Sequence, residues 1–500
     1  MTVDAVQTMK SALRALKLPD HRGCYYGGAW HEAKSGRSID TLNPGTGESL
    51  GPVADGAAAD IDAAVAVAKV AFREWRRVPP LERAKILKRI AQILRENAEE
   101  LAMIDAADCG NPVREMVSDA MVAAAQMEFF AGLVTEMKGS SIPMGPDVVN
   151  FSVREPRGVV GRIIPFNHPF MFCAGKSAAP LAAGNTIVVK PPEQSPLSSL
   201  RLAELMGGLL PPGVFNVVPG GREAGARLAS HPDVAMVALI GSVPTGRAVA
   251  KAAAETLKPT MLELGGKNAL IAYGDADIDD VAGAVIGGMN FTWCGQSCGS
   301  TSRAFLHESI HDAVIERVKA RIKAFKPGIP TDMATTMGAI VSKTQFERVM
   351  GYIESAKSEG ARLVNGGKRP DDPALARGFY IEPTVFADVT PKMRIAREEI
   401  FGPVLAIFKW RDEAEMLAEV NAVEYGLTCS IWTNDLSTAH RTAGAVEVGF
   451  VWINEVGKHF LGAPFGGFKQ SGIGREEGFE EMLAFTQEKN IHVRLKPAKG

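Results

Sequence analysis

The feature that most constrains the fold is an alternation of short apolar segments and helical segments between residues 159 and 257. The apolar segments have the length and composition of buried strands and lie at 159–164, 186–189, 214–218 and 236–240. The helical segments span 198–208, 223–230 and 247–257. This alternation predicts βαβ units and a parallel sheet, whose ligands bind beyond the carboxyl ends of the strands.

Candidate ligand-binding residues follow the first two of these strands. Asn167 lies between two prolines directly after the first strand, where its side chain can donate to an oxyanion or cap the turn. Lys190 and Glu193 follow the second strand, where they can grip the hydroxyls of a ribose or form an exposed ion pair. The residues alone leave both alternatives open at each place.

A turn that contains glycine connects the strand at 236–240 to the next helix. It includes Gly241, Ser242 and Gly246, and this strand–turn–helix arrangement suits a pyrophosphate group. The motif departs from GxGxxG because its middle glycine is replaced. Further along, Glu263 is separated by one residue from a pair of glycines. Its side chain is either a general base in a pocket or part of a surface turn.

Cys298 is the candidate nucleophile, and it lies in the glycine-containing stretch 293–303, which predicts a tight buried turn. Glycines beside a thiol leave room for a substrate and let backbone N–H groups point at a developing oxyanion. A thiol attacks a carbonyl at neutral pH because a few per cent is thiolate even at a pKa of ~8.5. Two alternatives remain, an inert buried cysteine and a metal site shared with Cys294, although no further His or Cys cluster lies nearby in the sequence.

Three segments near the C-terminus add to the pattern. Glu399 and Phe401 are two residues apart, so they lie on one side of the chain if the backbone is extended. The run at 464–476 is too rich in glycine for any regular element and predicts a shaped loop. Residues 490–495 predict an exposed edge strand, which invites pairing with another subunit.

Length and charge narrow the class of protein. A chain of 500 residues predicts two or more domains. A net charge of −2 does not indicate binding to nucleic acid or to an anionic membrane. Six cysteines in this length do not form a disulfide framework, and no apolar run approaches the ~20 residues of a membrane span. The N-terminal segment lacks the pattern of a signal peptide, and residues 9–18 predict a short helix or a frayed arm. We therefore expect a cytoplasmic protein.

Taken in order, these motifs resemble those of the NAD(P)-dependent aldehyde dehydrogenase superfamily, from about Tyr25 to the last strand. The resemblance is carried by segments 165–169, 190–193, 241–246, 263–267, 295–298, 399–403 and 464–476. It implies an α/β fold that consists of a Rossmann-like cofactor domain, an α/β catalytic domain and a small β-flap that joins subunits into a homodimer or homotetramer. The expected cofactor domain covers 24–133 and 155–262, the catalytic domain 263–465, the oligomerisation flap 134–154 and 479–500, and an N-terminal arm 1–23.

The resemblance also implies a role for each catalytic candidate. Cys298 matches the nucleophile that adds to the aldehyde carbonyl, and Asn167 matches the amide that holds the resulting oxyanion together with the backbone N–H of Cys298. Glu263 matches the residue that activates water to hydrolyse the thioester. Members that pass the acyl group to coenzyme A generally lack this glutamate, so hydrolysis to the acid is expected.

The cofactor positions follow from the same resemblance. Lys190 and Glu193 match the residues that grip the adenosine ribose, and the carboxylate at 193 would repel a 2′-phosphate, so NAD is expected rather than NADP. The turn residues Gly241, Ser242 and Gly246 match the pyrophosphate site. Residues Glu399 and Phe401 match the contacts to the nicotinamide ribose and ring, and no metal is expected.

The expected aldehyde pocket carries residues particular to this chain. Where many relatives have bulky apolar groups, this chain has His168, Phe172, Ser297 and His459. These residues lead to the hypothesis of a roomier and more polar pocket, suited to a polar, carboxylated or ring-bearing semialdehyde.

Several alternatives to this enzyme remain open from the sequence. They are a CoA-acylating or NADP-preferring aldehyde dehydrogenase, a catalytically inactive structural homologue, and a thiol hydrolase or acyltransferase that uses Cys298 without nicotinamide. The last is disfavoured because no motif places a partner histidine for the thiol.

Overall fold

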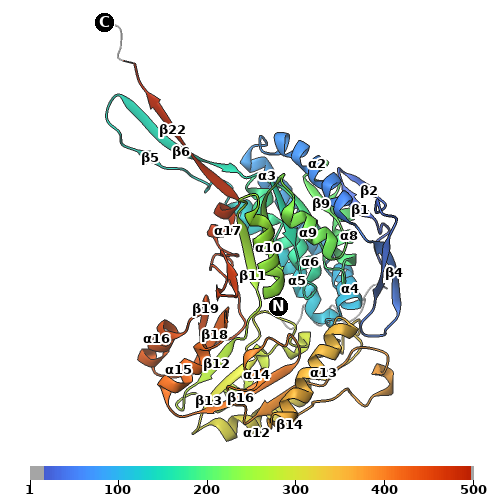
Figure 1. Cartoon of the computed structure of the whole chain (residues 1–500), viewed down its shortest axis with the longest axis vertical. Coiled ribbons are helices and arrows are strands. Elements are labelled where there is room, and N and C mark those ends of the chain that lie inside the picture. Colours follow the sequence, from blue (N-terminus) through green and yellow to red (C-terminus); the bar gives the residue numbers. More distant parts are fainter. Residues whose placement is uncertain (1–15, 497–500) are drawn as a thin grey trace.

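The computed structural model describes residues 16–496 and arranges them as an α/β protein around two large sheets (Figure 1). The first sheet has the strand order β2-β1-β9-β8-β7-β10-β11-β21. Its strands are β1 (Cys24–Tyr26), β2 (Ala29–His31), β7 (Val159–Ile163), β8 (Thr186–Lys190), β9 (Phe215–Val217), β10 (Val234–Gly241), β11 (Thr260–Leu264) and β21 (Gly472–Ile473).

The five central strands of this sheet run parallel, from β9 through β8, β7 and β10 to β11. Numbered along the chain from β7, their spatial order is 3-2-1-4-5, the order of a Rossmann-type sheet. The predicted strands and their parallel pairing are therefore confirmed. The order reverses between β7 and β10, and ligands of such sheets bind beyond the carboxyl ends of the strands at this place.

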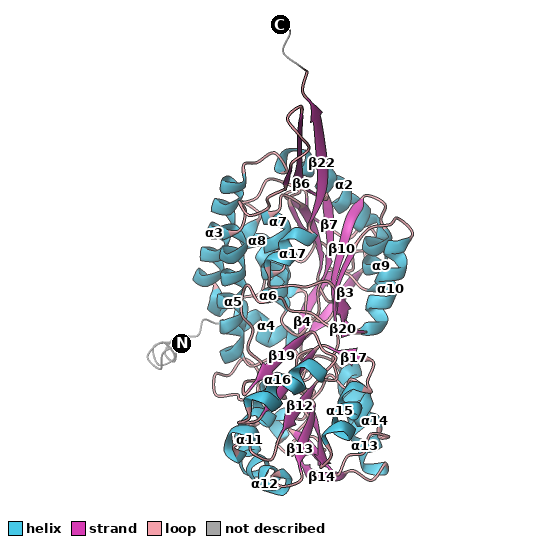
Figure 2. Ribbon diagram, turned by 90° about the vertical axis from the view of Figure 1, so that its left-hand side faces the viewer, coloured by secondary structure: helices cyan, strands magenta, loops and turns pink. Residues whose placement is uncertain are grey.

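Helices cover both faces of the first sheet, as Figure 2 shows. Their bounds are α2 (Ala58–Trp75), α3 (Pro80–Glu96), α4 (Ala98–Cys109), α5 (Val113–Gly132), α6 (Pro169–Gly175), α7 (Ala178–Ala182), α8 (Leu197–Met206), α9 (Arg222–Ser230) and α10 (Val243–Ala254). Helix α10 begins four residues earlier than the sequence predicted, because Ser242 caps it.

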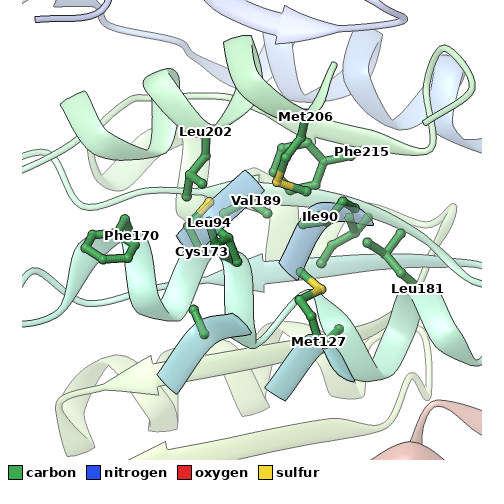
Figure 3. Packing of buried hydrophobic residues seen from close by; sticks show 14 of the residues in the cluster. Ile90, Leu94, Met127, Phe170, Cys173, Leu181, Val189, Leu202, Met206 and Phe215 are labelled. Atoms are coloured by element: carbon green, nitrogen blue, oxygen red, sulfur yellow. The ribbon is translucent and has the colours of Figure 1, made fainter. Parts of the chain in front are cut away.

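Alternate residues of β8 show how the two faces are filled. Ile187 and Val189 belong to the core beneath α3, α5 and α8, whereas Val188 faces the core beneath α2, α9 and α10. Successive side chains of a strand point to opposite faces, so a strand that is covered on both sides is apolar throughout. Figure 3 shows the first of these cores, where Ile90 and Met127 pack close to Val189.

The second sheet has the order β14-β15-β16-β13-β12-β18-β19 and is parallel except for β14. Its strands are β12 (Ala269–Ala272), β13 (Arg303–His307), β14 (Arg362–Asn365), β15 (Thr384–Ala387), β16 (Val404–Trp410), β18 (Thr428–Trp432) and β19 (Phe450–Ile453). Its helices are α11 (Ile278–Gly288), α12 (His311–Arg321), α13 (Lys343–Ser358), α14 (Arg394–Arg397), α15 (Glu413–Asn421) and α16 (Leu436–Ala445), with short 3₁₀ turns at Ile322–Ala324 and Pro373–Leu375.

A third, three-stranded sheet projects from the body of the protein (Figure 1). It consists of β5 (Ser141–Ile142), β6 (Val148–Pro156) and β22 (Thr486–Arg494), and β22 forms one edge. The predicted edge strand at 490–495 is confirmed and begins four residues earlier. The strands β3 (Ser38–Leu42) and β4 (Ser49–Ala54) pair antiparallel as a separate two-stranded sheet.

The prediction of a loop without regular structure at 464–476 is wrong in part. This run contains β20 (Phe468–Lys469) and β21, which pair with β17 (Tyr425–Gly426) and with β11. Backbone pairing with distant segments outweighs the weak local preference of glycine for a strand. Helix α17 (Phe479–Ala484) follows.

Two further expectations concern the chain ends and membranes. Most of the predicted helix or arm at 9–18 lies outside the described residues. Within residues 16–496, no helix has both the length and the apolar character needed to cross a bilayer.

Candidate active site

Asn167 lies just beyond the end of β7, at the switch point of the first sheet. It is buried, and its backbone carbonyl accepts a hydrogen bond of 2.6 Å from Nδ2 of Asn111. Its side-chain oxygen Oδ1 is enclosed without a partner among the described residues, and the cap of α6 is His168 rather than Asn167. The side chain of Asn167 therefore does not serve as a helix cap.

Cys298 lies on the turn that follows a short 3₁₀ helix, Phe291–Trp293. The residue is half-buried, and its carbonyl accepts a hydrogen bond of 2.7 Å from Nδ2 of Asn268. A Cβ atom at Gly266 would approach this carbonyl to 2.8 Å, so the glycine is needed for the turn to pack. Within residues 16–496, no group of three His, Cys, Asp or Glu residues is placed to hold a metal ion.

Glu263 and Cys298 meet side chain to side chain. Glu263 lies on β11, is only 4% exposed, and has a hydrogen-bonding contact with the thiol of Cys298. Burial, with the charge of Glu476, raises the pKa of Glu263 to about 8. Burial and the neighbouring Glu263 likewise raise the pKa of Cys298 well above its usual range. The surface-turn alternative for Glu263 is wrong, and the Cys298 thiol rests in its protonated form beside a carboxyl group that can accept a proton.

Glu399 and Phe401 border the turn that carries Cys298, since both line a small cavity together with Ser297. Oε1 of Glu399 accepts a hydrogen bond of 3.0 Å from the backbone N–H of Gly266, and its other oxygen occupies the space that a Cβ atom at Gly265 would need. Burial raises the pKa of Glu399 to about 7. The assumption of an extended backbone is wrong here, because Phe401 has a φ of 55°, in the left-handed region.

Aromatic contacts connect Asn167 to both of these segments. The ring of Phe166, the preceding residue, packs edge-on against Phe401 with centroids 5.6 Å apart. The ring of His168, the following residue, packs edge-on against Trp293 at 4.7 Å. Asn167 is thus held between the 399–401 segment and the turn that carries Cys298.

Lys190 and Glu193 lie at the end of β8, near the beginning of α9. Lys190 is buried, which lowers its pKa to about 8, whereas Glu193 is exposed. Among the described residues, no carboxylate lies within 4.0 Å of the Lys190 ammonium group. The alternative of an exposed ion pair between these two residues is therefore wrong.

The turn between β10 and α10 has the predicted strand–turn–helix geometry. Oγ of Ser242 accepts a hydrogen bond of 3.4 Å from the backbone N–H of Thr245, and Gly241 is the last residue of the strand. A Cβ atom at Gly246 would lie 2.5 Å from Cδ1 of Leu264, so Gly246 lets the helix pack closely on β11. In the first turn of α10, Pro244 has no N–H group and that of Thr245 bonds to Ser242, so the backbone N–H group of Val243 is the one offered at the switch point.

The four predicted pocket residues do not form one cluster. His168 packs edge-on against Phe172 with ring centroids 5.9 Å apart, and Ser297 lines a small cavity beside Phe401. His459 is exposed, packs on Phe465 at 4.5 Å, and places Nδ1 3.1 Å from Glu477. The structure brings His168 and Phe172 into contact but shows no contact of His459 with the other three.

Sequence comparison assigns the chain to a family. The model of the aldehyde dehydrogenase family matches residues 30–491. The chain belongs to the aldehyde dehydrogenase family. It is 51% identical over 486 residues to the aldehyde dehydrogenase tropH of Talaromyces stipitatus, a match that covers 96% of this chain and 94% of that protein.

Solved aldehyde dehydrogenase structures have the same fold. The structure of a putative aldehyde dehydrogenase from Burkholderia cenocepacia superposes with a TM-score of 0.93 at 41% identity, over 96% of this chain and 99% of that one. An aldehyde dehydrogenase from Bacillus cereus, solved as its NAD⁺ complex, gives a TM-score of 0.92 at 37% identity, over 99% of each chain. The predicted aldehyde dehydrogenase fold and enzyme class are confirmed.

Sequence reasoning missed an ion network behind Glu263. Glu476 is only 3% exposed and bonds to Nη2 of Arg162 at 2.6 Å and to Nζ of Lys176 at 2.9 Å. Burial alone would raise the pKa of Glu476, but the charges of Lys176 and Arg162 hold it at about 2. An arginine within the otherwise apolar strand β7 was the available signal, because a buried cation needs a buried partner.

Proposed function

We propose that this aldehyde dehydrogenase oxidises an aldehyde to a carboxylic acid through a covalent adduct on Cys298, with NAD as the hydride acceptor. The observation that supports this most directly is the contact between the Glu263 carboxyl group and the Cys298 thiol. It places a proton acceptor beside a nucleophile that rests in its protonated form.

The first step is attack on the aldehyde. The Glu263 carboxylate accepts the thiol proton as the Cys298 sulfur forms a bond to the carbonyl carbon, and the C=O electron pair moves to oxygen. The side-chain amide of Asn167 and the backbone N–H of Cys298 stabilise this oxyanion in a site that excludes bulk water. Asn111 holds the Asn167 backbone in place, which orients the amide. Bound NAD supplies the acceptor for the hydride that leaves as the thiohemiacetal becomes a thioester.

The second step is hydrolysis. Glu263, which has first released the thiol proton to solvent, takes a proton from water as the water oxygen adds to the thioester carbon. The C–S bond then breaks to release the acid, and the proton on Glu263 returns to the Cys298 sulfur, which restores the thiol and the carboxylate. A pKa of about 8 suits this role because the ionised form, whose share grows as pH rises through this value, is a stronger proton acceptor than an ordinary carboxylate. The presence of Glu263 favours water over coenzyme A as the acyl acceptor.

The residues at the switch point fit a dinucleotide. Lys190 is buried without a carboxylate partner among the described residues, and a buried ammonium group needs acceptors such as ribose hydroxyls. Ser242 and the backbone N–H group of Val243 suit the pyrophosphate, and Glu399 with Phe401 suits the nicotinamide riboside. The exposed Glu193 carboxylate would repel a 2′-phosphate, which supports NAD over NADP.

An NADH assay tests the proposal. Cys298→Ala is expected to lower kcat/KM for any oxidised aldehyde by roughly a thousandfold or more, because no covalent adduct forms. Cys294→Ala is the matched control, since this cysteine is buried on the same turn and is not placed to react. A Cys298→Ala variant that reduces NAD as fast as the parent protein would overturn the mechanism.

The substrate we propose is a polar, carboxylated or ring-bearing semialdehyde. His168 and Ser297 near the reacting groups support a polar pocket. Equal activity toward long-chain alkanals and toward semialdehydes would contradict this choice.

The projecting third sheet supports assembly. Exposed apolar side chains on it, Ile142, Val149 and Val493, suit an interface. We propose that 134–154 and 479–500 join subunits into a homodimer or homotetramer, that 24–133 and 155–262 form the cofactor domain, and that 263–465 form the catalytic domain. A cytoplasmic location and the absence of nucleic-acid or membrane partners remain part of this proposal. Sedimentation of a variant that lacks β22 tests the interface, because it should sediment as a smaller species.

A further inference from the structure

A buried histidine–carboxylate pair lies beside the reacting groups. Nδ1 of His168 is 2.8 Å from Oδ2 of Asp119, and both residues are buried. His168 directly follows Asn167 and caps α6, whereas Asp119 lies on α5. A carboxylate at this distance fixes a proton on Nδ1 and stabilises the imidazolium form.

The titratable groups that face His168 are all acidic. Asp119 reaches it from α5 and Asp105 from α4, and no cation acts on it appreciably. Burial alone would lower the pKa of His168, but the charge and hydrogen bond of Asp119 and the charge of Asp105 raise it above its ordinary value. Burial raises the pKa of Asp105 itself to about 8, so near neutral pH Asp105 adds little charge and the raised pKa of His168 depends mainly on Asp119. A single proton on His168 is thus balanced by one nearby carboxylate.

The other ring nitrogen of His168 is not used by the protein. Nε2 makes no hydrogen bond to any residue within 16–496, yet it is not among the polar atoms that are fully enclosed. The ring packs edge-on against Trp293 with centroids 4.7 Å apart, and the indole Nε1 of Trp293 is enclosed without an acceptor. Two N–H groups without protein acceptors therefore belong to rings in edge-on contact, one on the residue that follows Asn167 and one on the turn that carries Cys298.

We propose that His168, held by Asp119, forms with the indole N–H of Trp293 a subsite that selects aldehydes carrying an anionic group, foremost a carboxylate. The inference rests on the proposed function and names the class of substrate. A carboxylate accepts hydrogen bonds from two donors at once, and a charged donor strengthens them in a site of low dielectric. An alkanal leaves both donors without acceptors, which costs binding energy.

The test compares ω-oxo acids of four to six carbons with alkanals of the same length. For each length, the ratio of the two kcat/KM values measures selection of the carboxylate. His168→Phe is expected to lower this ratio by about 10- to 100-fold, mainly through KM for the oxo acid. His168→Gln keeps a neutral hydrogen-bond donor, so its ratio should lie between those of the parent and of His168→Phe. His440→Phe, at an exposed histidine on α16, should leave the ratio unchanged.

The pH dependence of the ratio separates a charged donor from a merely structural residue. The ratio should fall as pH rises through the pKa of His168, and in Asp119→Asn this fall should move to lower pH, because the anion that raises the pKa is gone. Titration of Glu263 and Cys298 affects both substrates and cancels in the ratio.

Two outcomes overturn the inference, and neither depends on the variants' stability. One is a ratio that does not change with pH in the parent protein, and the other is a ratio in His168→Gln equal to that of the parent at every chain length. Failure of the parent to oxidise any aldehyde would instead overturn the proposed function. Oxidation of alkanals without selection of oxo acids overturns only this subsite.

Discussion

Glu263 and Glu476 are almost equally buried, at 4% and 3% exposure, yet their pKa values are shifted in opposite directions. Burial raises that of Glu263 to about 8, whereas Lys176 and Arg162 hold that of Glu476 at about 2. The difference lies in the partners, since Glu476 bonds to two cations and Glu263 has a thiol beside it and one enclosed oxygen without a partner. Burial therefore produces a base in one place and a fixed anion in the other.

The largest expected effect follows from replacing Glu263, the glutamate that has no cationic partner. Glu263→Gln should lower kcat about 10²- to 10⁴-fold, because neither the thiol nor the attacking water then has a proton acceptor. The rise of activity with pH through about pH 8 should vanish with it. Steady-state NADH formation from pH 6 to 9 measures both, with Glu480→Gln, an exposed glutamate on α17, as the control. Turnover in Glu263→Gln equal to that of the parent would show that Glu263 is not the base of the reaction.

Replacing Glu476, the glutamate that is paired with two cations, should lower the stability of the protein. Glu476→Gln leaves the buried charges of Lys176 and Arg162 without their carboxylate and should lower the free energy of unfolding by about 3–5 kcal/mol. Urea unfolding measures this loss. Adding Lys176→Met to the variant should recover part of it, because one unpaired charge is removed. Equal stability of Glu476→Gln and the parent would contradict the assigned network.

The two glutamates should also give opposite slopes of stability against pH. The raised pKa of Glu263 gives stability that is complete below its unfolded value of about 4.3 and is lost as pH rises to about 8. The lowered pKa of Glu476 gives stability that is present above about 4.3 and is lost as pH falls toward about 2. Unfolding free energies of Glu263→Gln and the parent, measured from pH 5 to 9, should differ least at the acidic end and diverge by up to a few kcal/mol at the alkaline end, where the buried carboxyl group of the parent ionises. Parallel curves would show that Glu263 titrates normally.

The smallest effect concerns the coupling between the two residues. The charge of Lys176 lowers the pKa of Glu263, whereas that of Glu476 raises it. Lys176→Met should therefore move the activity transition of Glu263 to higher pH, by about one unit or less. The pH profile of kcat/KM for a neutral alkanal measures this shift, and a shift to lower pH would reverse the assigned sign.

Much of the site could be predicted because each residue carries a local signal. Asn167 and Ser242 follow apolar strands, and Cys298 lies in a glycine-containing turn, so position along the chain was enough to propose them. The path of the backbone at Phe401 and the two short strands in the glycine-rich run could not be predicted in this way. Both depend on hydrogen bonds or close packing with segments that are remote in sequence.

The sequence by itself determined the alternation of strands and helices, and with it the parallel sheet and the edge at which ligands bind. Hydrophobic periodicity is a local property, so it can be found along the chain. Only the tertiary structure decided which buried groups are charged. Glu263, Glu476 and His168 acquire their pKa values from partners on other elements, and electrostatic interaction depends on distance in space rather than along the chain.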